Sequence, residues 1–86
     1  MRNLELPGRS PVRSTGAMAA TSHPLSTLTA IEVLRAGGNA IDAAIAACAV
    51  QGVVEPQSTG IGGDCFALMS LGGSDEIIAF NGSGRA

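Results

Sequence analysis

Residues 34–44, Leu-Arg-Ala-Gly-Gly-Asn-Ala-Ile-Asp-Ala-Ala, contain the signals that end one helix and begin another. Glycine at position 37 suits the left-handed conformation that commonly closes a helix. Asn39 is a favourable N-cap residue, and Asp42 three positions later can complete a capping-box-like pair while its charge suits a helix N-terminus. This stretch therefore predicts two consecutive helices joined by a tight glycine turn.

The helix before the turn is predicted to begin at Pro24, because proline suits the first helical position. Ser22 and His23 precede it, and we expect His23 to cap the helix and not to act as a general base. Apolar residues recur every three positions and should lie along one face of this helix. They are Leu25, Leu28, Ile31 and Leu34.

The second helix is predicted to run from Ala40 to about Val54 and is apolar nearly all round. A helix of that kind is buried on most sides, whereas the first helix offers only one apolar face. We therefore expect further protein to cover it, with Cys48 as an inert core thiol. The apolar run from Ala43 to Val50 is much shorter than the roughly 20 residues of a membrane-spanning helix.

Extended segments are predicted on both sides of the helices. Residues 15–21 are interpreted as a short buried strand, and residues 57–64 as a glycine-rich loop. Residues 65–70 and 76–80 then read as two strands joined by a turn at 72–75. The expected order is strand, two helices, β-hairpin, which is an α+β arrangement.

Composition excludes several classes of function. The 86 residues carry a net charge of -2 with no run of like charge, so nucleic-acid and anionic-membrane binding are not indicated. One histidine and two distant cysteines do not make a metal site, and no cofactor is expected. The loop Gly60–Gly63 lacks the Lys-Ser/Thr of a phosphate-binding loop. The start of the chain has no apolar signal segment, so we expect a cytoplasmic protein with reduced thiols.

Three strings in this order resemble the beginning of the γ-glutamyltransferases, also called glutathione hydrolases. Residues 20–25 read Ala-Thr-Ser-His-Pro-Leu, residues 34–44 are quoted above, and residues 54–63 read Val-Glu-Pro-Gln-Ser-Thr-Gly-Ile-Gly-Gly. The resemblance runs from about Thr15 to the last residue. Residues 1–14 are therefore interpreted as a loose lead-in, and residues 15–86 as an incomplete N-terminal part of the large subunit.

The resemblance implies an N-terminal-nucleophile hydrolase with a four-layer αββα fold, made as a precursor that cleaves itself into a large and a small subunit. In the family, a threonine at the new amino terminus of the small subunit attacks a γ-glutamyl amide such as glutathione, and water or an amine then accepts the acyl group. No residue here matches that threonine, so no catalytic residue is assigned. The implied partners are the rest of the large subunit, the small subunit and a small acyl-amide substrate, with neither nucleic acid nor membrane.

One substrate-binding candidate follows from the resemblance. An arginine in the family motif Arg-Glu-Thr/Met-Ala-Pro holds the substrate α-carboxylate, and the comparable segment here is Ser83-Gly84-Arg85-Ala86. Aligning Ala86 with the alanine of the motif places Ser83 at the arginine position, and Arg85 becomes the candidate carboxylate ligand. The alternative for Arg85 is a solvated loop residue without a ligand.

The departure at Ser83 leaves two further alternatives open for the function. The enzyme could be a related cephalosporin-acylase-like amidohydrolase with a different acyl group. The chain could also be a small non-catalytic α+β binding module, complete at 86 residues. We favour a chain truncated at Ala86, because the strand-like run before it is followed by no closing helix or polar tail.

Overall fold

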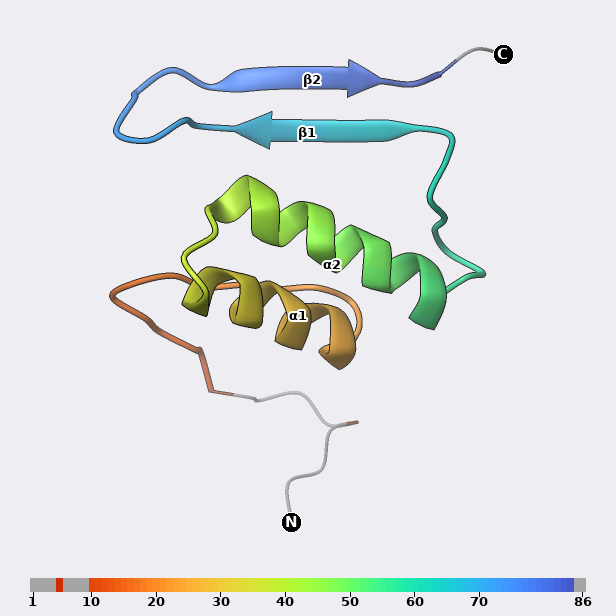
Figure 1. The fold of residues 1–86 in the computed structure, drawn as a ribbon, viewed down its shortest axis with the longest axis horizontal. Coiled ribbons are helices and arrows are strands. Elements are labelled where there is room, and N and C mark those ends of the chain that lie inside the picture. Colours follow the sequence, from red (N-terminus) through yellow and green to blue (C-terminus); the bar gives the residue numbers. More distant parts are fainter. Residues whose placement is uncertain (1–4, 6–9, 85–86) are drawn as a thin grey trace.

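The computed structural model describes residue 5 and residues 10–84. Two helices, α1 (Pro24–Arg35) and α2 (Ala40–Val54), precede two strands, β1 (Cys65–Met69) and β2 (Ile78–Gly82). Figure 1 shows the helices side by side and the antiparallel hairpin beyond α2. The predicted α+β class and both predicted helices are confirmed.

The turn between the helices has the geometry that its two glycines predict. Gly37 has φ +100°, and its N–H donates to the carbonyl of Leu34 at 3.2 Å. The N–H of Gly38 donates to the carbonyl of Val33 at 2.9 Å, which completes a Schellman motif. A Cβ atom on Gly38 would lie 2.6 Å from Val33 Cγ1. Position 37 thus needs glycine for its backbone angle, and position 38 needs it for space.

Both helix N-termini are capped as predicted. His23 is the N-cap of α1, and its Nδ1 accepts from the N–H of Leu25 at 3.1 Å. In the capping box of α2, Asn39 Oδ1 accepts from the N–H of Asp42 at 2.8 Å, while Asp42 Oδ2 accepts from the N–H of Asn39 at 3.1 Å. These bonds satisfy backbone donors that a helix leaves without internal partners.

The buried contact between the helices is made by small side chains, and Leu34 of the leucine row packs against it. Ser26 and Ala30 of α1 are buried with Ala43 and Ala47 of α2. Leu25 and Leu28 remain 51% and 52% exposed, so the face predicted from the three-residue repeat is only partly used. Residues four apart on each helix form the contact, because small side chains there let the two backbones approach closely.

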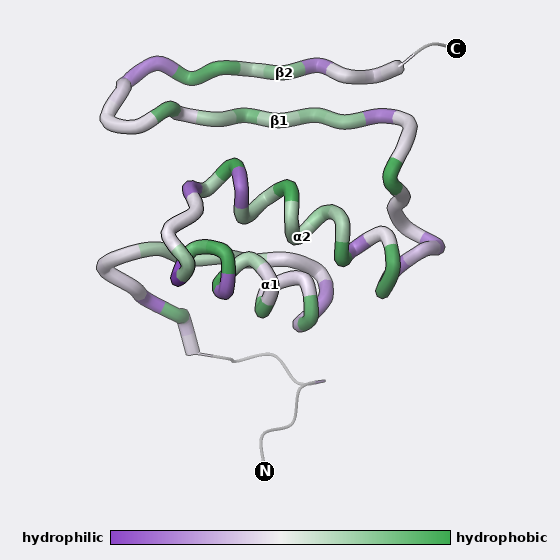
Figure 2. The backbone as a smooth tube through the Cα atoms, in the orientation of Figure 1, coloured by the Kyte–Doolittle hydropathy of each residue, from purple (hydrophilic) through white to green (hydrophobic). Residues whose placement is uncertain are grey.

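Large parts of α2 are left uncovered. Ile45 is 65% exposed and Val53 is 77% exposed, and Figure 2 shows that most of the α2 trace is coloured as hydrophobic. Cys48 is also exposed, so its prediction as a core thiol is wrong for the described residues. Across residue 5 and residues 10–84, no helix combines the length and the hydropathy needed to cross a bilayer.

The hairpin differs from the prediction in its second strand. Met69 pairs with Ile78 and Cys65 pairs with Gly82, so the return strand is displaced from the predicted residues 76–80. The longer loop arises because β1 ends at Met69, which leaves residues 70–77 to make the reversal. Within the described residues the hairpin makes no element contact with either helix.

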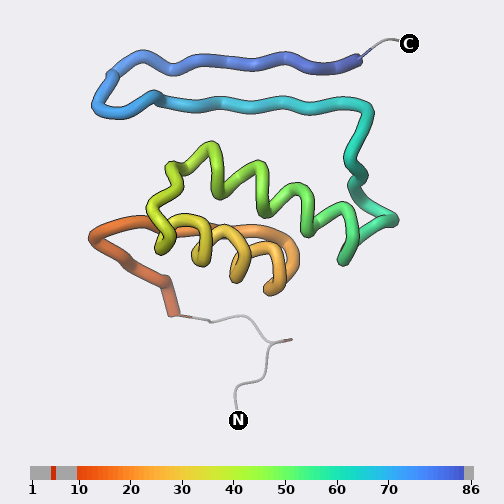
Figure 3. Tube along the Cα trace, viewed as in Figure 1, coloured from red at the N-terminus to blue at the C-terminus, as the bar shows by residue number. Residues whose placement is uncertain are grey.

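The strand predicted at residues 15–21 is wrong, because no residue of this segment belongs to a strand. The segment passes along the helix pair before the chain reverses into α1 (Figure 3). Ala19 is half-buried against the alanine core. In the described part of the chain this segment has no strand beside it, and a strand cannot form without a partner for its backbone groups.

Candidate functional site

A hydrogen-bonded network of three polar side chains joins the start of α1 to the end of α2. Ser22 Oγ donates to Glu55 Oε1 at 2.8 Å. Gln51 Nε2 donates to the same carboxylate oxygen at 2.6 Å and also donates to Ser22 Oγ. The three residues each contact the other two, so we call them the Ser22–Gln51–Glu55 network. It connects residues 29 and 33 positions apart in the sequence.

The helices explain why these side chains meet. Gln51 lies in the last turn of α2 and Glu55 is its C-cap, so their side chains lie one turn apart on the same face. Ser22 directly precedes the N-cap His23, and packing of α1 on α2 brings it to that face. Gln51 and Glu55 are half-buried.

A second pair of hydroxyl groups stabilises the approach to α1. Thr21 Oγ1 donates to the carbonyl of His23 at 2.7 Å and lies 2.7 Å from Thr27 Oγ1. Because the Thr21 proton is used by the carbonyl, Thr27 donates to Thr21. Both sides of residue 22 are therefore held by hydrogen bonds, which limits the positions that Ser22 can adopt.

The glycine-rich loop starts at the same network. The carbonyl of Glu55 accepts from the N–H of Ser58 at 3.0 Å and from that of Thr59 at 3.2 Å. Farther along, Gly60 approaches Gly52 of α2, where an added Cβ would lie 3.7 Å from the Gly60 backbone. Glu55 thus holds the network with its side chain and the first turn of the loop with its main chain.

A hollow of about 320 Å³ lies where these pieces meet. Its polar lining consists mainly of hydroxyl and amide groups, and none of its lining residues is charged. The residues around it are Ala20, Thr21, Ser22, Ala47, Cys48, Gln51, Ser58 and Thr59. This hollow and the Ser22–Gln51–Glu55 network beside it form the candidate site.

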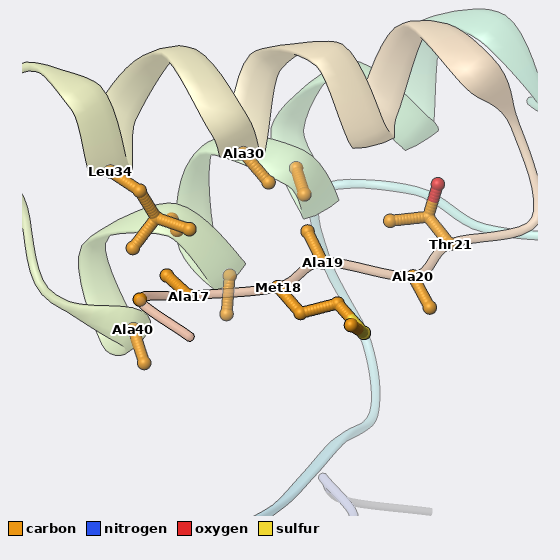
Figure 4. A pocket seen from close by; sticks show the side chains of 12 residues that line it. Ala17, Met18, Ala19, Ala20, Thr21, Ala30, Leu34 and Ala40 are labelled. Carbon is orange, nitrogen blue, oxygen red and sulfur yellow. The ribbon is translucent and has the colours of Figure 1, made fainter. Parts of the chain in front are cut away.

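A second hollow, of about 400 Å³, lies between residues 16–21 and the helix pair. Figure 4 shows Ala30 and Leu34 pointing from α1 toward the chain around Ala17 and Ala19. No titratable side chain lines this hollow, and the hydroxyl of its lining residue Thr21 is hydrogen-bonded to His23 and Thr27, so the hollow offers packing space without an acid or a base.

The residues considered from sequence are placed as follows. Arg85, the candidate carboxylate ligand, lies outside the described residues. His23 serves as a cap, and its Nδ1 is occupied by a backbone N–H. Cys65 is an exposed free thiol like Cys48. Among residue 5 and residues 10–84, no three His, Cys, Asp or Glu residues gather to hold a metal ion.

Sequence reasoning did not identify Gln51 or Glu55 as members of a site. The available signal was two polar side chains four positions apart at the end of an apolar helix, but nothing local shows that Ser22 joins them. The network holds hydroxyl, amide and carboxylate groups in fixed positions: Ser22 Oγ donates to Glu55 and accepts from Gln51, so the three side chains are engaged with one another. Its chemical capacity is therefore to bind and position.

Comparison with known proteins agrees with the resemblance of the three strings. Residues 26–86 match the family model described as Gamma-glutamyltranspeptidase. A glutathione hydrolase-like proenzyme, YwrD, of Bacillus subtilis is 40% identical over 87% of this chain and 14% of its own length. An oxamate amidohydrolase proenzyme of Klebsiella pneumoniae is 44% identical over 85% of this chain and 14% of its own length. A glutathione hydrolase proenzyme of Bacillus subtilis is 41% identical over 80% of this chain and 12% of its own length.

The capped helix pair, glycine loop and hairpin thus define an α+β segment whose relatives are hydrolase proenzymes. The chain belongs to the gamma-glutamyltranspeptidase family. It spans about one seventh of the length of the YwrD and oxamate amidohydrolase proenzymes.

Proposed function

We propose that this chain is the N-terminal part of the large subunit of an amide-cleaving enzyme that is made as a self-cleaving precursor. The enzyme removes the acyl group from a γ-glutamyl amide such as glutathione and transfers it to water or an amine. The observation that carries this proposal is the family match over residues 26–86. The relatives named as glutathione hydrolase and oxamate amidohydrolase proenzymes support it.

The proposed fold is the four-layer αββα arrangement of N-terminal-nucleophile hydrolases. Directly opposite residues of a hairpin share a face, so Phe66 and Leu68 lie on one face while Ala67, Met69 and Phe80 lie on the other. A sheet that is apolar on both faces is suited to burial between two layers. The apolar surface all round α2 supports the same interpretation.

In the proposed mechanism the nucleophile comes from the small subunit. Its N-terminal threonine hydroxyl attacks the amide carbonyl and passes its proton to the α-amine. The resulting α-ammonium gives this proton to the leaving nitrogen as the amide C–N bond breaks, which releases the amine product. Water or an acceptor amine then attacks the acyl-enzyme ester and regenerates the hydroxyl. The contribution proposed for this chain is to build one side of the site and to bind the substrate.

The direct test is to produce the full-length protein and follow its processing. We expect internal cleavage into two polypeptides, with a threonine at the new amino terminus identified by mass spectrometry, and release of amine from γ-glutamyl substrates. A protein that stays uncleaved and inactive would contradict the proposal and favour the non-catalytic module.

Arg85 is proposed to bind the carboxylate of the substrate, because a guanidinium group can donate two parallel hydrogen bonds to it. In the full-length enzyme, Arg85→Ala should raise KM about tenfold or more with a smaller change in kcat. Arg35→Ala, at the exposed end of α1, is the matched control and should leave both constants unchanged. An unchanged KM in Arg85→Ala would make Arg85 a solvated loop residue.

A second candidate function is hydrolysis of a different acyl amide. If Ala86 aligns with the alanine of the family motif, Ser83 stands at the arginine position, and relatives include an oxamate amidohydrolase and an acylase, ACY 1, of Pseudomonas. The assay should therefore compare γ-glutamyl amides, oxamate and an acylated cephalosporin amide by kcat/KM. Preference for either of the last two would select the amidohydrolase alternative.

A further inference from the structure

The loop after α2 has glycine at positions 60 and 62, and no contact within the described residues requires glycine at either position. A Cβ on Gly60 or Gly62 would meet no atom within 4 Å, and neither residue has a positive φ. Packing within the described residues therefore tolerates side chains there. Glycine in such a place keeps the main chain accessible for close approach by another group.

The same loop is fixed at its start. Glu55 binds Ser22 and Gln51 through Oε1 and holds the N–H groups of Ser58 and Thr59 through its carbonyl. Gln51, with Asp42, is one of two polar side chains in α2, and its Nε2 donates to both other members of the network. A half-buried carboxylate that accepts two such bonds is held in one orientation.

We propose that the Ser22–Gln51–Glu55 network is a positioning device that fixes the glycine loop 57–63 as one wall of the substrate site. This inference rests on the proposed function, because it assigns the wall to the amide-cleaving site. The hollow of about 320 Å³ beside Ser58 and Thr59 lies between the network and the loop. Glu55 acts through the loop and does not touch the reacting atoms, so it is a positioning residue.

The test compares Glu55→Ala with Glu55→Gln in the full-length protein. Glutamine keeps an oxygen that can accept from both Ser22 and Gln51, whereas alanine removes it. We expect Glu55→Ala to raise KM about tenfold with little change in kcat, and Glu55→Gln to stay close to the wild type. Glu32→Ala is the matched control, since it removes an exposed glutamate of α1.

A second readout does not depend on activity. Hydrogen exchange measured by mass spectrometry should become about tenfold faster for peptides covering residues 57–63 in Glu55→Ala, with no change in Glu32→Ala. Ser22→Ala removes one member of the network without altering α2, and it replaces Glu55→Ala if that variant does not fold. It should accelerate exchange in the same peptides.

The outcomes separate the inference from the proposed function. An inactive wild type with faster loop exchange in Glu55→Ala would remove the proposed function and, with it, the assignment of this wall to a substrate site. An active wild type in which Glu55→Ala leaves KM and loop exchange unchanged would overturn the inference alone. Glu55→Gln as impaired as Glu55→Ala would also overturn it, because charge and not hydrogen-bond geometry would then be responsible.

Discussion

At the residue scale, the two glycines of the helix turn have different physical roles. Gly37 supplies a positive φ, and Gly38 supplies space beside the last turn of α1. The nearest atoms to an added Cβ at position 38 belong to Val33, whose branched side chain has little rotamer freedom. Relief of such a contact requires the turn itself to move.

Gly38→Ala should therefore lower the free energy of unfolding by about 1 to 3 kcal/mol, the usual cost of forcing extra atoms into a packed place. Urea unfolding of the full-length protein measures this change. Gly72→Ala is the matched control, because a Cβ there meets no atom within 4 Å and should change stability by less than about 0.5 kcal/mol. Equal effects of the two substitutions would show that space at position 38 is not the cause.

At the element scale, the contact between α1 and α2 depends on small residues. Ala30, Ala43 and Ala47 form the buried core, and the hydroxyl of Ser26, which is also buried, has no hydrogen-bond partner among the described residues. An unpaired buried hydroxyl lowers the stability of the fold, so the close packing of the two helices must stabilise it by more than this cost. A residue at this interface must therefore be small, and whether it is apolar matters less.

Ala47→Leu should push the helices apart and lower the free energy of unfolding by about 1 to 3 kcal/mol. Thermal unfolding followed by circular dichroism gives the comparison with Ala36→Leu, which adds the same atoms at the exposed C-cap of α1. If Ala47→Leu unfolds at the same temperature as the control, the helix contact is loose enough to accept the larger side chain.

At the scale of the whole molecule, the described chain has very little core for its apolar content. Three alanines are its only buried hydrophobic residues, while Ile45, Val53, Phe66 and Phe80 are exposed. The hairpin also lacks contact with the helices in the described residues, and an isolated two-stranded hairpin is marginally stable in water. Burial of these surfaces requires additional protein.

A polypeptide consisting of residues 1–86 alone should therefore show no cooperative thermal transition and should self-associate through its apolar surface. Circular dichroism and analytical ultracentrifugation measure the two properties. A monomer with a sharp unfolding transition would contradict this expectation and support an independent binding module.

Much of the local structure could be predicted from sequence. The helix starts at Pro24 and Ala40, the glycine turn and the role of His23 as a cap are all confirmed. The strand expected at residues 15–21, the buried state of Cys48 and the bounds of the second hairpin strand were wrong. Each of these errors concerns a property that depends on a partner element.

The candidate site shows the same division. The sequence by itself determined the helix ends and the turn, because caps and glycine conformations depend on residues within about four positions of each other. Only the tertiary structure decided that Ser22 meets Gln51 and Glu55, that alanines form the buried contact between the helices, and that Met69 pairs with Ile78. These contacts join distant residues, and their geometry follows from how the elements pack and not from any local pattern.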